Sequence, residues 1–221
     1  MLALQRVYAR IVSNHKTQGP KVWTVLRFYP KMGSNSRKEE PVTIPGLRGG
    51  DHVGFTVPDL DAAEDFLVGI LGAEPIYVLG PKRSDDTDWM TVQLGVHPRT
   101  AIEQIRFYRL GTGLNIELFQ YDAADGQQQH PRNSDLGGHH LALYVDDLDA
   151  AVAYLREHDV EVMGEPVPSA GASEGQRWVY FRAPWGMQFE LVSYPGGKAY
   201  ERDGGPLLWH PANPARVDPA Q

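Results

Sequence analysis

An internal repeat constrains the fold of this 221-residue chain more than any other sequence feature. A gapless match joins HVGFTVPDLDAA at residues 52–63 to HLALYVDDLDAA at 140–151, and NIEL at 115–118 is echoed by QFEL at 188–191. Self-similarity of this kind is typical of repeated structural units. The two stretches of the second match lie closer together in the chain than those of the first match, so the first copy is the longer one. This predicts an insertion in the first copy at residues 85–101.

Each copy predicts the same order of elements, β-α-β-β-β. A helix follows the first strand of each copy, with apolar residues at helical spacing and Asp61 or Asp149 as the expected N-cap. The fold class is therefore expected to be α+β, with tandem βαβββ modules whose mixed sheet forms a cup. The strands are predicted at 52–57, 75–79, 103–110 and 114–121 in the first copy, and at 140–145, 160–163, 176–182 and 187–193 in the second.

The repeat also sets the expected domain boundaries. The insertion carries Trp89, Met90, Val92 and Leu94, which predict a short helix with an apolar face, either a lid over a substrate or a contact with a partner subunit. Met32 is an alternative translation start. The expected parts are a loosely packed N-terminal extension (1–50), a first module (51–125), a second module (126–195), and an extended tail (196–221) anchored by Leu207, Leu208 and Trp209.

Composition narrows the chemistry. The chain has no Cys, which excludes a disulfide framework, zinc fingers, iron–sulfur clusters and a thiol nucleophile, so that His, Asp and Glu must hold any metal. Its formal net charge of −7 argues against nucleic-acid binding, which needs a basic surface. It has neither the roughly 20-residue apolar run of a membrane span nor the continuous apolar region of a secretion signal. We therefore expect a cytoplasmic protein that acts on a small molecule, without nucleic-acid or membrane partners.

Four chemistry-bearing residues recur at equivalent places in the two copies. His52 and His140 open the first strand of each copy, and Glu117 and Glu190 lie inside the last. Because side chains alternate along a strand, each Glu is expected on the face opposite its apolar neighbours, looking into the cup. Two imidazoles and two carboxylates suit a divalent ion such as Zn²⁺, Ni²⁺, Co²⁺, Mn²⁺ or Fe²⁺. The alternative, four structural residues, would require chance to place both pairs at matching positions.

Other candidate residues follow from the same strand alternation. Arg106, Tyr108 and Arg109 are candidates for binding an anionic substrate, although the pattern does not set their face. Trp178 and Trp185 are expected to line the cavity or to cover its rim. Ordinary barrel packing is the alternative for the three strand residues and for the substrate-binding candidates that follow. The residues predicted to bind substrate, because they share the face of the expected ligands, are Thr56, Asn115, Phe119, Tyr144 and Gln188.

The chain resembles the vicinal-oxygen-chelate superfamily over about residues 51–195. Members include glyoxalase I, methylmalonyl-CoA epimerase, extradiol dioxygenases, and the fosfomycin and bleomycin resistance proteins. The resemblance implies the glyoxalase fold and a divalent metal held by His52, Glu117, His140 and Glu190, with His139 in a structural or supporting role. It is carried by DHVGFTVPDLDAAEDFLVGILGAEP, LNIELFQY, GGHHLALYVDDLDAAVAYLREHDVEV and APWGMQFELVSYP.

The resemblance also implies a reaction. In such enzymes the metal stabilises the enediolate that forms when a proton leaves the carbon between two neighbouring oxygens. A carboxylate moves that proton, and we expect Glu190 to be the first choice and Glu117 the second. The implied activity is that of a lyase or isomerase similar to glyoxalase I or to the epimerases.

Departures from the family patterns leave alternatives open. Thr56 stands where glyoxalase I has an Arg that binds glutathione, and Tyr121 stands where that enzyme has an Asn. Glu117 would fill a coordination place that extradiol dioxygenases leave open. An Fe(II)-dependent dioxygenase and a non-catalytic resistance or binding protein are the alternatives. The chain is expected to form a homodimer, and its cup is formed either within one chain or across two.

Overall fold

The structure, a computed structural model, describes residues 44–45, 47, 49–204 and 207–214. The chain divides into two compact units, Met1–Leu47 and Arg48–Gln221, and every helix and strand named below belongs to the second unit. The alternative start at Met32 lies outside the described residues. Within the described part of the chain, no helix has the length and apolar character needed to span a membrane.

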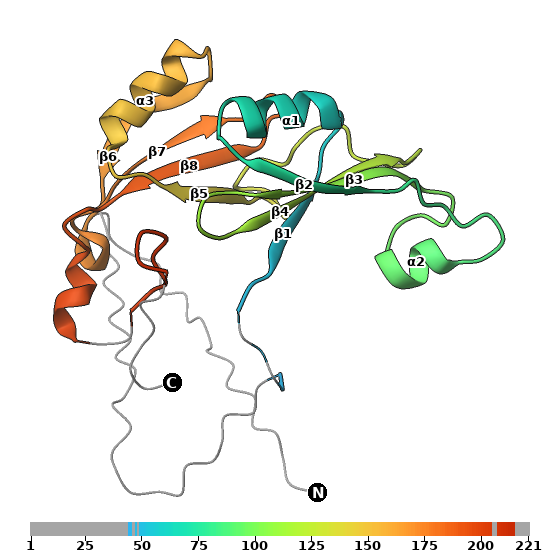
Figure 1. Cartoon of the computed structure of the whole chain (residues 1–221), viewed down its shortest axis with the longest axis horizontal. Helices are drawn as coiled ribbons and strands as arrows, with labels where there is room; N and C mark the ends of the chain where they lie inside the picture. Colours follow the sequence, from blue (N-terminus) through green and yellow to red (C-terminus); the bar gives the residue numbers. More distant parts are fainter. Residues whose placement is uncertain (1–43, 46, 48, 205–206, 215–221) are drawn as a thin grey trace, which may run out of the picture. The chain divides into compact units, whose positions relative to one another are not determined.

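The repeat seen in the sequence is a repeat of structure (Figure 1). The strands form two four-stranded sheets, in the orders β1-β4-β3-β2 and β5-β8-β7-β6. β1 runs parallel to its neighbour β4, and β5 runs parallel to its neighbour β8. The predicted α+β class and tandem βαβββ modules are thereby confirmed. The first module contains β1 (His52–Thr56), α1 (Leu60–Gly69), β2 (Glu74–Leu79), α2 (Trp89–Leu94), β3 (Ala101–Arg109) and β4 (Asn115–Asp122). The second contains β5 (His140–Tyr144), α3 (Leu148–Glu157), β6 (Val162–Pro168), the 3₁₀ turn η1 (Gly171–Ser173), β7 (Arg177–Arg182) and β8 (Gln188–Ser193), followed by η2 (Ala199–Asp203).

The two long helices are capped one aspartate earlier than predicted. Asp59 is the N-cap of α1 and accepts hydrogen bonds from two backbone N–H groups of the first turn, and Asp147 accepts one at the start of α3. The prediction of Asp61 or Asp149 as the cap was wrong, because each helix begins at the Leu between its two aspartates. The later aspartate lies in the first turn, where its negative charge still suits the helix dipole.

Two other elements differ in extent or in exposure from their predictions. The strand expected at 160–163 begins at Val162 and continues to Pro168, with an irregular register after Met163. The insertion does form the predicted short helix, α2. Its Met90 is fully buried, whereas the side chain of Val92 is 63% exposed.

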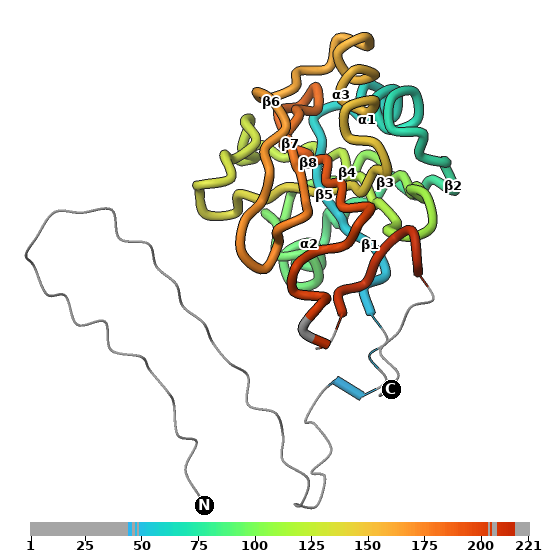
Figure 2. The backbone as a smooth tube through the Cα atoms, turned by 90° about the vertical axis from the view of Figure 1, so that its left-hand side faces the viewer, coloured from blue at the N-terminus to red at the C-terminus, as the bar shows by residue number. Residues whose placement is uncertain are grey.

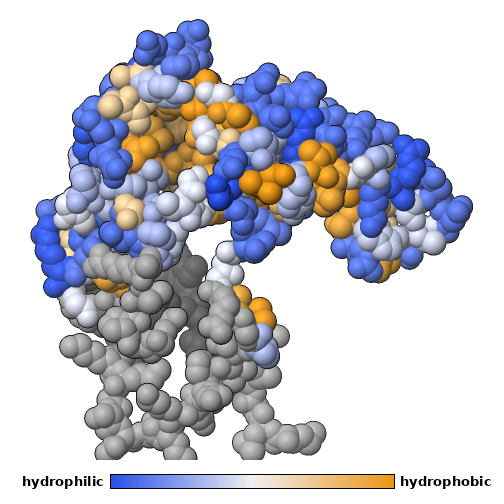
Figure 3. Space-filling model, viewed as in Figure 1, coloured by the Kyte–Doolittle hydropathy of each residue, from blue (hydrophilic) through white to orange (hydrophobic). Residues whose placement is uncertain are grey.

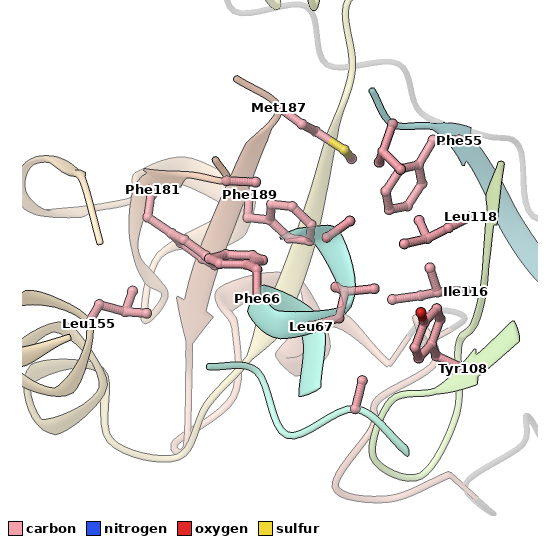
Figure 4. Close-up of a cluster of buried hydrophobic side chains, with 14 of the residues drawn as sticks. Phe55, Phe66, Leu67, Tyr108, Ile116, Leu118, Leu155, Phe181, Met187 and Phe189 are labelled. Carbon is pink, nitrogen blue, oxygen red and sulfur yellow. The ribbon is translucent and has the colours of Figure 1, made fainter. Parts of the chain in front are cut away.

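The core joins the two modules through α1. Phe66 of this helix lies 6.5 and 6.0 Å from Phe181 and Phe189 of the second sheet, measured between ring centroids. Figure 4 shows α1 between apolar side chains of the first sheet and those of the second. Figures 1 and 2 both show α1 and α3 on the same side of β7 and β8. Among the residues that the structure describes, the two sheets are therefore joined by a shared core and not by strand pairing.

The C-terminal segment of residues 207–214 is held by aromatic contacts and by hydrogen bonds, among them one from the hydroxyl of Thr112 to the backbone oxygen of Pro211 at 2.9 Å. The ring of His210 packs against Tyr144 and Tyr194, with centroids 4.5 and 4.9 Å apart, and Trp209 rests on Gly113 of the first module. Of the three residues predicted to anchor the tail, Trp209 contacts the first module, whereas the side chain of Leu208 is 66% exposed and only its backbone N–H is bound, donating to the hydroxyl of Tyr200 at 3.0 Å.

Candidate functional site

The first predicted pair, His52 and Glu117, is assembled by the parallel pairing of β1 with β4. The register places Gly54 directly opposite Glu117, and His52 two residues earlier on the same strand face. The imidazole Nε2 of His52 lies 3.1 Å from Oε2 of Glu117. A Cβ atom on Gly54 would stand only 3.3 Å from that oxygen, so the missing side chain at this position leaves room for the carboxylate.

The second pair repeats this arrangement in the second module. Parallel pairing of β5 with β8 places Ala142 opposite Glu190, and Nε2 of His140 lies 3.0 Å from Oε2 of Glu190. His139, the neighbour of His140, instead packs against His130 with ring centroids 5.0 Å apart. The sequence repeat is thus a repeat of side-chain geometry at the two predicted pairs.

The donor atoms of each pair are spaced as two ligands of one metal ion. Ligand bonds of about 2.1 Å at angles of about 90–110° place the two donor atoms about 3.0–3.4 Å apart. The distances of 3.1 and 3.0 Å agree with this spacing, which also suits a hydrogen bond in the metal-free state. Nδ1 of His52 donates to Asp51 at 2.8 Å. A carboxylate partner of this kind orients a ligating imidazole and leaves Nε2 for the metal. The donor types and the spacing of each pair therefore fit two of the ligands of a divalent ion.

An aromatic ring flanks each histidine at an equivalent place. Phe107 stands opposite Glu117 on β3 and meets His52 edge-on, with ring centroids 5.8 Å apart. Tyr180 stands opposite Glu190 on β7 and meets His140 in the same way at 5.2 Å. Sequence reasoning missed both rings. Their signal was the alternation within the predicted strands 103–110 and 176–182, which places them on the ligand face once the pairing register is known.

The structure does not bring the two pairs together within one chain. No group of three or more His, Asp or Glu side chains in the described ranges is placed to hold a metal ion. The histidine side chains of the pairs are 39% and 37% exposed, whereas the side chains of Glu117 and Glu190 are only 14% and 12% exposed. Each pair is thus a shallow two-donor site at the surface of its own sheet.

Burial and neighbouring charges shift the pKa values at both pairs. The hydrogen bond with Asp51 is the largest influence on the pKa of His52 and raises it. Burial raises the pKa of Glu190, while the positive charges of His140 and Lys198 act in the opposite direction. The raised pKa makes Glu190 a stronger base than an ordinary carboxylate.

Lys198 is a candidate that sequence reasoning missed. Its ammonium lies over the ring of Tyr194, 4.2 Å from the centroid, and interacts electrostatically with Glu190. It follows the turn Gly196–Gly197 in a stretch without strand or helix periodicity, so the sequence offered no signal that it returns to the second pair. It provides a positive charge close to a predicted catalytic carboxylate.

The five residues predicted to bind substrate lie on the ligand faces of their strands, and whether they contact a substrate stays a prediction. Asn115 donates to the backbone oxygen of Asp51 at 3.0 Å and so supports the segment before His52. Gln188 donates to the sulfur of Met163 at 3.1 Å. The other three are Thr56, which is exposed, Phe119, whose ring stacks on Tyr121 at 5.5 Å, and Tyr144, which packs against His210.

The remaining candidate residues lie partly on the helix-packed faces of the sheets and partly on the ligand faces. Arg106 forms ion pairs with Asp61 and Glu64 of α1, so it faces the helix and not the predicted metal pair. Tyr108 is buried on the same side and donates to Glu64 at 2.7 Å. Arg109 pairs with Glu74 at the start of β2. Trp185 packs against Phe55 within the core region, whereas Trp178 contacts Tyr180 on the ligand face.

Comparisons with known proteins agree with this architecture. Residues 51–181 match a family described as the Glyoxalase/Bleomycin resistance protein/Dioxygenase superfamily. The chain is 47% identical over 170 residues to a 2-epi-5-epi-valiolone epimerase from an Actinomyces species, a match that covers 76% of this chain and 91% of that protein. It is 32% identical over 122 residues to an ethylmalonyl-CoA/methylmalonyl-CoA epimerase from Cereibacter sphaeroides, covering 55% and 79%. The structure of a glyoxalase family protein from Bacillus cereus superposes with a TM-score of 0.51 at 21% identity, over 68% of this chain and 98% of that one, and shows the same fold.

Proposed function

The chain belongs to the Glyoxalase/Bleomycin resistance protein/Dioxygenase superfamily, and from this premise we propose that it is a metal-dependent epimerase of a small hydroxylated ketone. The observation that carries the proposal is the 47% identity to a 2-epi-5-epi-valiolone epimerase over 91% of that protein. The second curated relative is also an epimerase, which supports the reaction class although it acts on a CoA thioester. We take 2-epi-5-epi-valiolone as the first substrate to test.

The duplicated pairs suit the demands of epimerisation. Inverting a carbon requires a group that removes its proton on one face and a group that returns a proton on the opposite face. Glu117 and Glu190 occupy equivalent places in two repeated modules, and we propose that they approach a substrate from opposite sides when the two pairs meet. We assign Glu190 as the first proton acceptor, because burial raises its pKa, and Glu117 as the group on the other face. One proton passes from the carbon to Glu190 and another is delivered from Glu117, and the two carboxyl groups then exchange protons with water, so no oxidant or co-substrate is needed.

The metal role follows from the donor set. If the two pairs meet, His52, Glu117, His140 and Glu190 would hold the ion, which would supply positive charge for the negative charge that develops on the substrate oxygens. The adjacent faces carry the side chains that we propose contact the rest of the substrate. They are Thr56, Asn115, Phe119, Tyr144 and Gln188.

The test is deuterium exchange at the carbon beside the carbonyl. Purified protein loaded with Mn²⁺, Zn²⁺ or Ni²⁺ is incubated with 2-epi-5-epi-valiolone in D₂O, and NMR follows deuterium uptake and the appearance of an epimer. We expect both in the wild type, loss of both after chelation, and rates lower by about 100-fold or more in Glu190→Gln and Glu117→Gln. Glu157→Gln, an exposed substitution at the end of α3, is the matched control and should leave the rate unchanged.

Two results would overturn the proposal. Oxygen consumption with cleavage of a substrate, and no exchange of hydrogen, would assign a dioxygenase instead. Binding of the ketone without exchange under any metal would assign a binding protein.

A further inference from the structure

The chain returns to the second pair through a turn that two glycines make possible. Gly197, directly before Lys198, has a φ of 77°, a left-handed conformation that favours glycine. Gly175, which follows η1 by two residues, packs against this turn. A Cβ atom on Gly175 would lie 2.5 Å from the backbone oxygen of Gly197. Neither position could carry a side chain without moving the turn, so the path of the backbone into Lys198 is fixed.

Hydrogen bonds hold the backbone on both sides of Lys198. Its own N–H donates to Oε1 of Glu201 at 3.1 Å, and the N–H of Ala199 donates to the backbone oxygen of Glu174 at 2.9 Å. The side chain of Lys198 thus starts from a rigid base. A rigid base is what a group needs if it is to be held precisely for binding or for chemistry.

The side chain of Lys198 turns back over the second sheet. Most lysines extend into water, but Lys198 is half-buried, and its ammonium lies 4.2 Å from the centroid of the Tyr194 ring. Tyr144 and His210 hold that ring, with centroids 5.0 and 4.9 Å away. Tyr194 directly follows β8 and has the same strand parity as Glu190, so the ammonium lies on the ligand face of the second module.

The ammonium of Lys198 and the carboxylate of Glu190 are close to each other but not in contact. Burial raises the pKa of Glu190 and lowers that of Lys198, and the attraction between the two charges opposes both shifts. Within the described ranges, however, no ion pair of 4.0 Å or less joins these two groups. They are therefore near enough to act on one ligand without neutralising each other directly.

The first module lacks an equivalent cation. Tyr121 follows Glu117 by four residues, as Tyr194 follows Glu190. The ring of Tyr121 stacks on Phe119, with centroids 5.5 Å apart, and among the described residues no lysine lies over it. The two otherwise equivalent carboxylates thus differ in one neighbouring positive charge. Negative charge on a ligand is consequently more favourable beside Glu190.

The largest groove of the second unit offers no such place. It has a volume of about 790 Å³ and lies beside β5, with α3 and the residues that follow α1 in its walls. Figure 3 shows apolar surface between α1 and α3. Of the described residues that line the groove, none is Lys, Arg or His. A negative charge without a cation or a polar partner is costly in apolar surroundings. A ligand oxygen that becomes charged therefore requires the ligand face.

We propose that Lys198 binds the ketone oxygen of the substrate and stabilises the negative charge that develops there when Glu190 takes the proton from the neighbouring carbon. The electron pair of the broken C–H bond moves toward that oxygen, and the proton goes to Glu190. Lys198 donates a hydrogen bond and keeps its own proton. A carbonyl oxygen has two lone pairs, so one stays free for the ion. For the reaction, this inference rests on the proposed function.

Two substitutions separate the charge of Lys198 from its shape. Lys198→Met keeps an unbranched side chain and removes the charge, whereas Lys198→Arg keeps the charge. In the deuterium-exchange assay we expect kcat to fall about 100-fold in Lys198→Met while KM changes by less than about threefold, because the hydrogen bond is strongest once negative charge has developed. Lys198→Arg should stay within about tenfold of the wild type, since its donors have a different geometry.

Lys82→Met is the matched control. The ammonium of Lys82 also lies over an aromatic ring, 3.6 Å from the centroid of Trp89, but it is exposed and belongs to the insertion of the first module. Its loss should leave kcat and KM unchanged.

Oxalate binding tests the same contact without turnover. Oxalate carries negative charge on neighbouring oxygens, as the substrate does after proton loss. Calorimetry with Mn²⁺-loaded protein should show oxalate affinity at least about tenfold weaker in Lys198→Met and within about threefold of the wild type in Lys198→Arg. The affinity for Mn²⁺ alone and the melting temperature should stay close to those of the wild type in both variants.

The outcomes separate this inference from the proposed function. Equal oxalate affinity in Lys198→Met and the wild type, an unchanged kcat, or a wild type that does not bind oxalate would overturn the inference. A lower melting temperature and weaker Mn²⁺ binding in both Lys198 variants would give the residue a structural role and overturn it as well. If the wild type exchanges no deuterium into the ketone, the proposed function fails, while oxalate binding still decides whether Lys198 binds a charged oxygen.

Discussion

Gly54 sets how closely β1 can approach the carboxylate of the first pair. A Cβ atom there would lie 3.3 Å from Oε2 of Glu117 and 3.4 Å from the ring of Phe119. The second module has Ala142 at the equivalent position opposite Glu190, and that pair keeps its 3.0 Å spacing. A single methyl group is therefore compatible with the geometry, whereas a branched side chain would displace the carboxylate.

Gly54→Val is expected to weaken metal binding about tenfold, or about 1.4 kcal/mol. Valine favours strands, so the variant should fold, and its melting temperature should stay close to that of the wild type. Gly54→Ala is the matched control and should keep its affinity within about threefold. Titration with Mn²⁺ measures both, and equal affinities for the Val variant and the wild type would show that Glu117 does not need this space.

The pairing geometry of the candidate site was predictable only where the repeat marked it, and the roles of its residues stay predictions. His52, Glu117, His140 and Glu190 stand at matching positions, so a single alignment of the chain with itself finds all four. Lys198 has no counterpart in the first module, and its place near Glu190 depends on how the chain turns after β8. A residue at a repeated position can be recognised from the sequence alone. Where a loop residue such as Lys198 comes to lie depends on how the whole chain folds.

At the start of α1, two neighbouring aspartates could each serve as the N-cap, and only one of them does. Asp59 accepts hydrogen bonds from the N–H groups of Asp61 and Ala62, at 2.9 and 3.1 Å, whereas the side chain of Asp61 is 86% exposed and pairs with Arg106. Satisfying otherwise unpaired N–H groups contributes more to stability than an exposed ion pair.

Asp59→Ala is therefore expected to lower the free energy of unfolding by about 1 kcal/mol, within the usual range for a lost N-cap. Asp61→Ala should cost about 0.5 kcal/mol, because it removes one exposed ion pair and one favourable charge in the first turn. Urea unfolding at one fixed chain concentration compares the two. A larger loss of stability in Asp61→Ala than in Asp59→Ala would show that Asp61, the N-cap predicted from the sequence, caps the helix.

Strand prediction succeeded where alternation was regular and failed where it was broken. The residues around Glu190 alternate without interruption, and β8 is found at Gln188–Ser193, close to the predicted 187–193. β6 includes Gly164 with a positive φ of 79°, which interrupts its pairing with β7 and hides its extent from any two-residue pattern.

At the scale of the whole second unit, the repeat predicted two modules but not how they pack. Phe66 and Tyr154 occupy equivalent helix positions in the two modules. Phe66 is 5% exposed and lies among aromatic rings of the other module, whereas Tyr154 is 40% exposed. Two equivalent sequence positions thus have different environments, because α1 lies between both sheets. This asymmetry comes from tertiary packing, which a local pattern does not encode.

The asymmetry makes a paired prediction about stability. Phe66→Ala should lower the free energy of unfolding by about 3–5 kcal/mol, because it opens a cavity in the core that joins the modules. Tyr154→Ala should cost about 1 kcal/mol, mainly for its hydrogen bond to the backbone oxygen of Ile70. Since one core serves both modules, the wild type should unfold in a single transition, seen alike by tryptophan fluorescence and by circular dichroism. Equal losses in the two variants, or separate transitions for the two probes, would mean that the modules are stabilised independently.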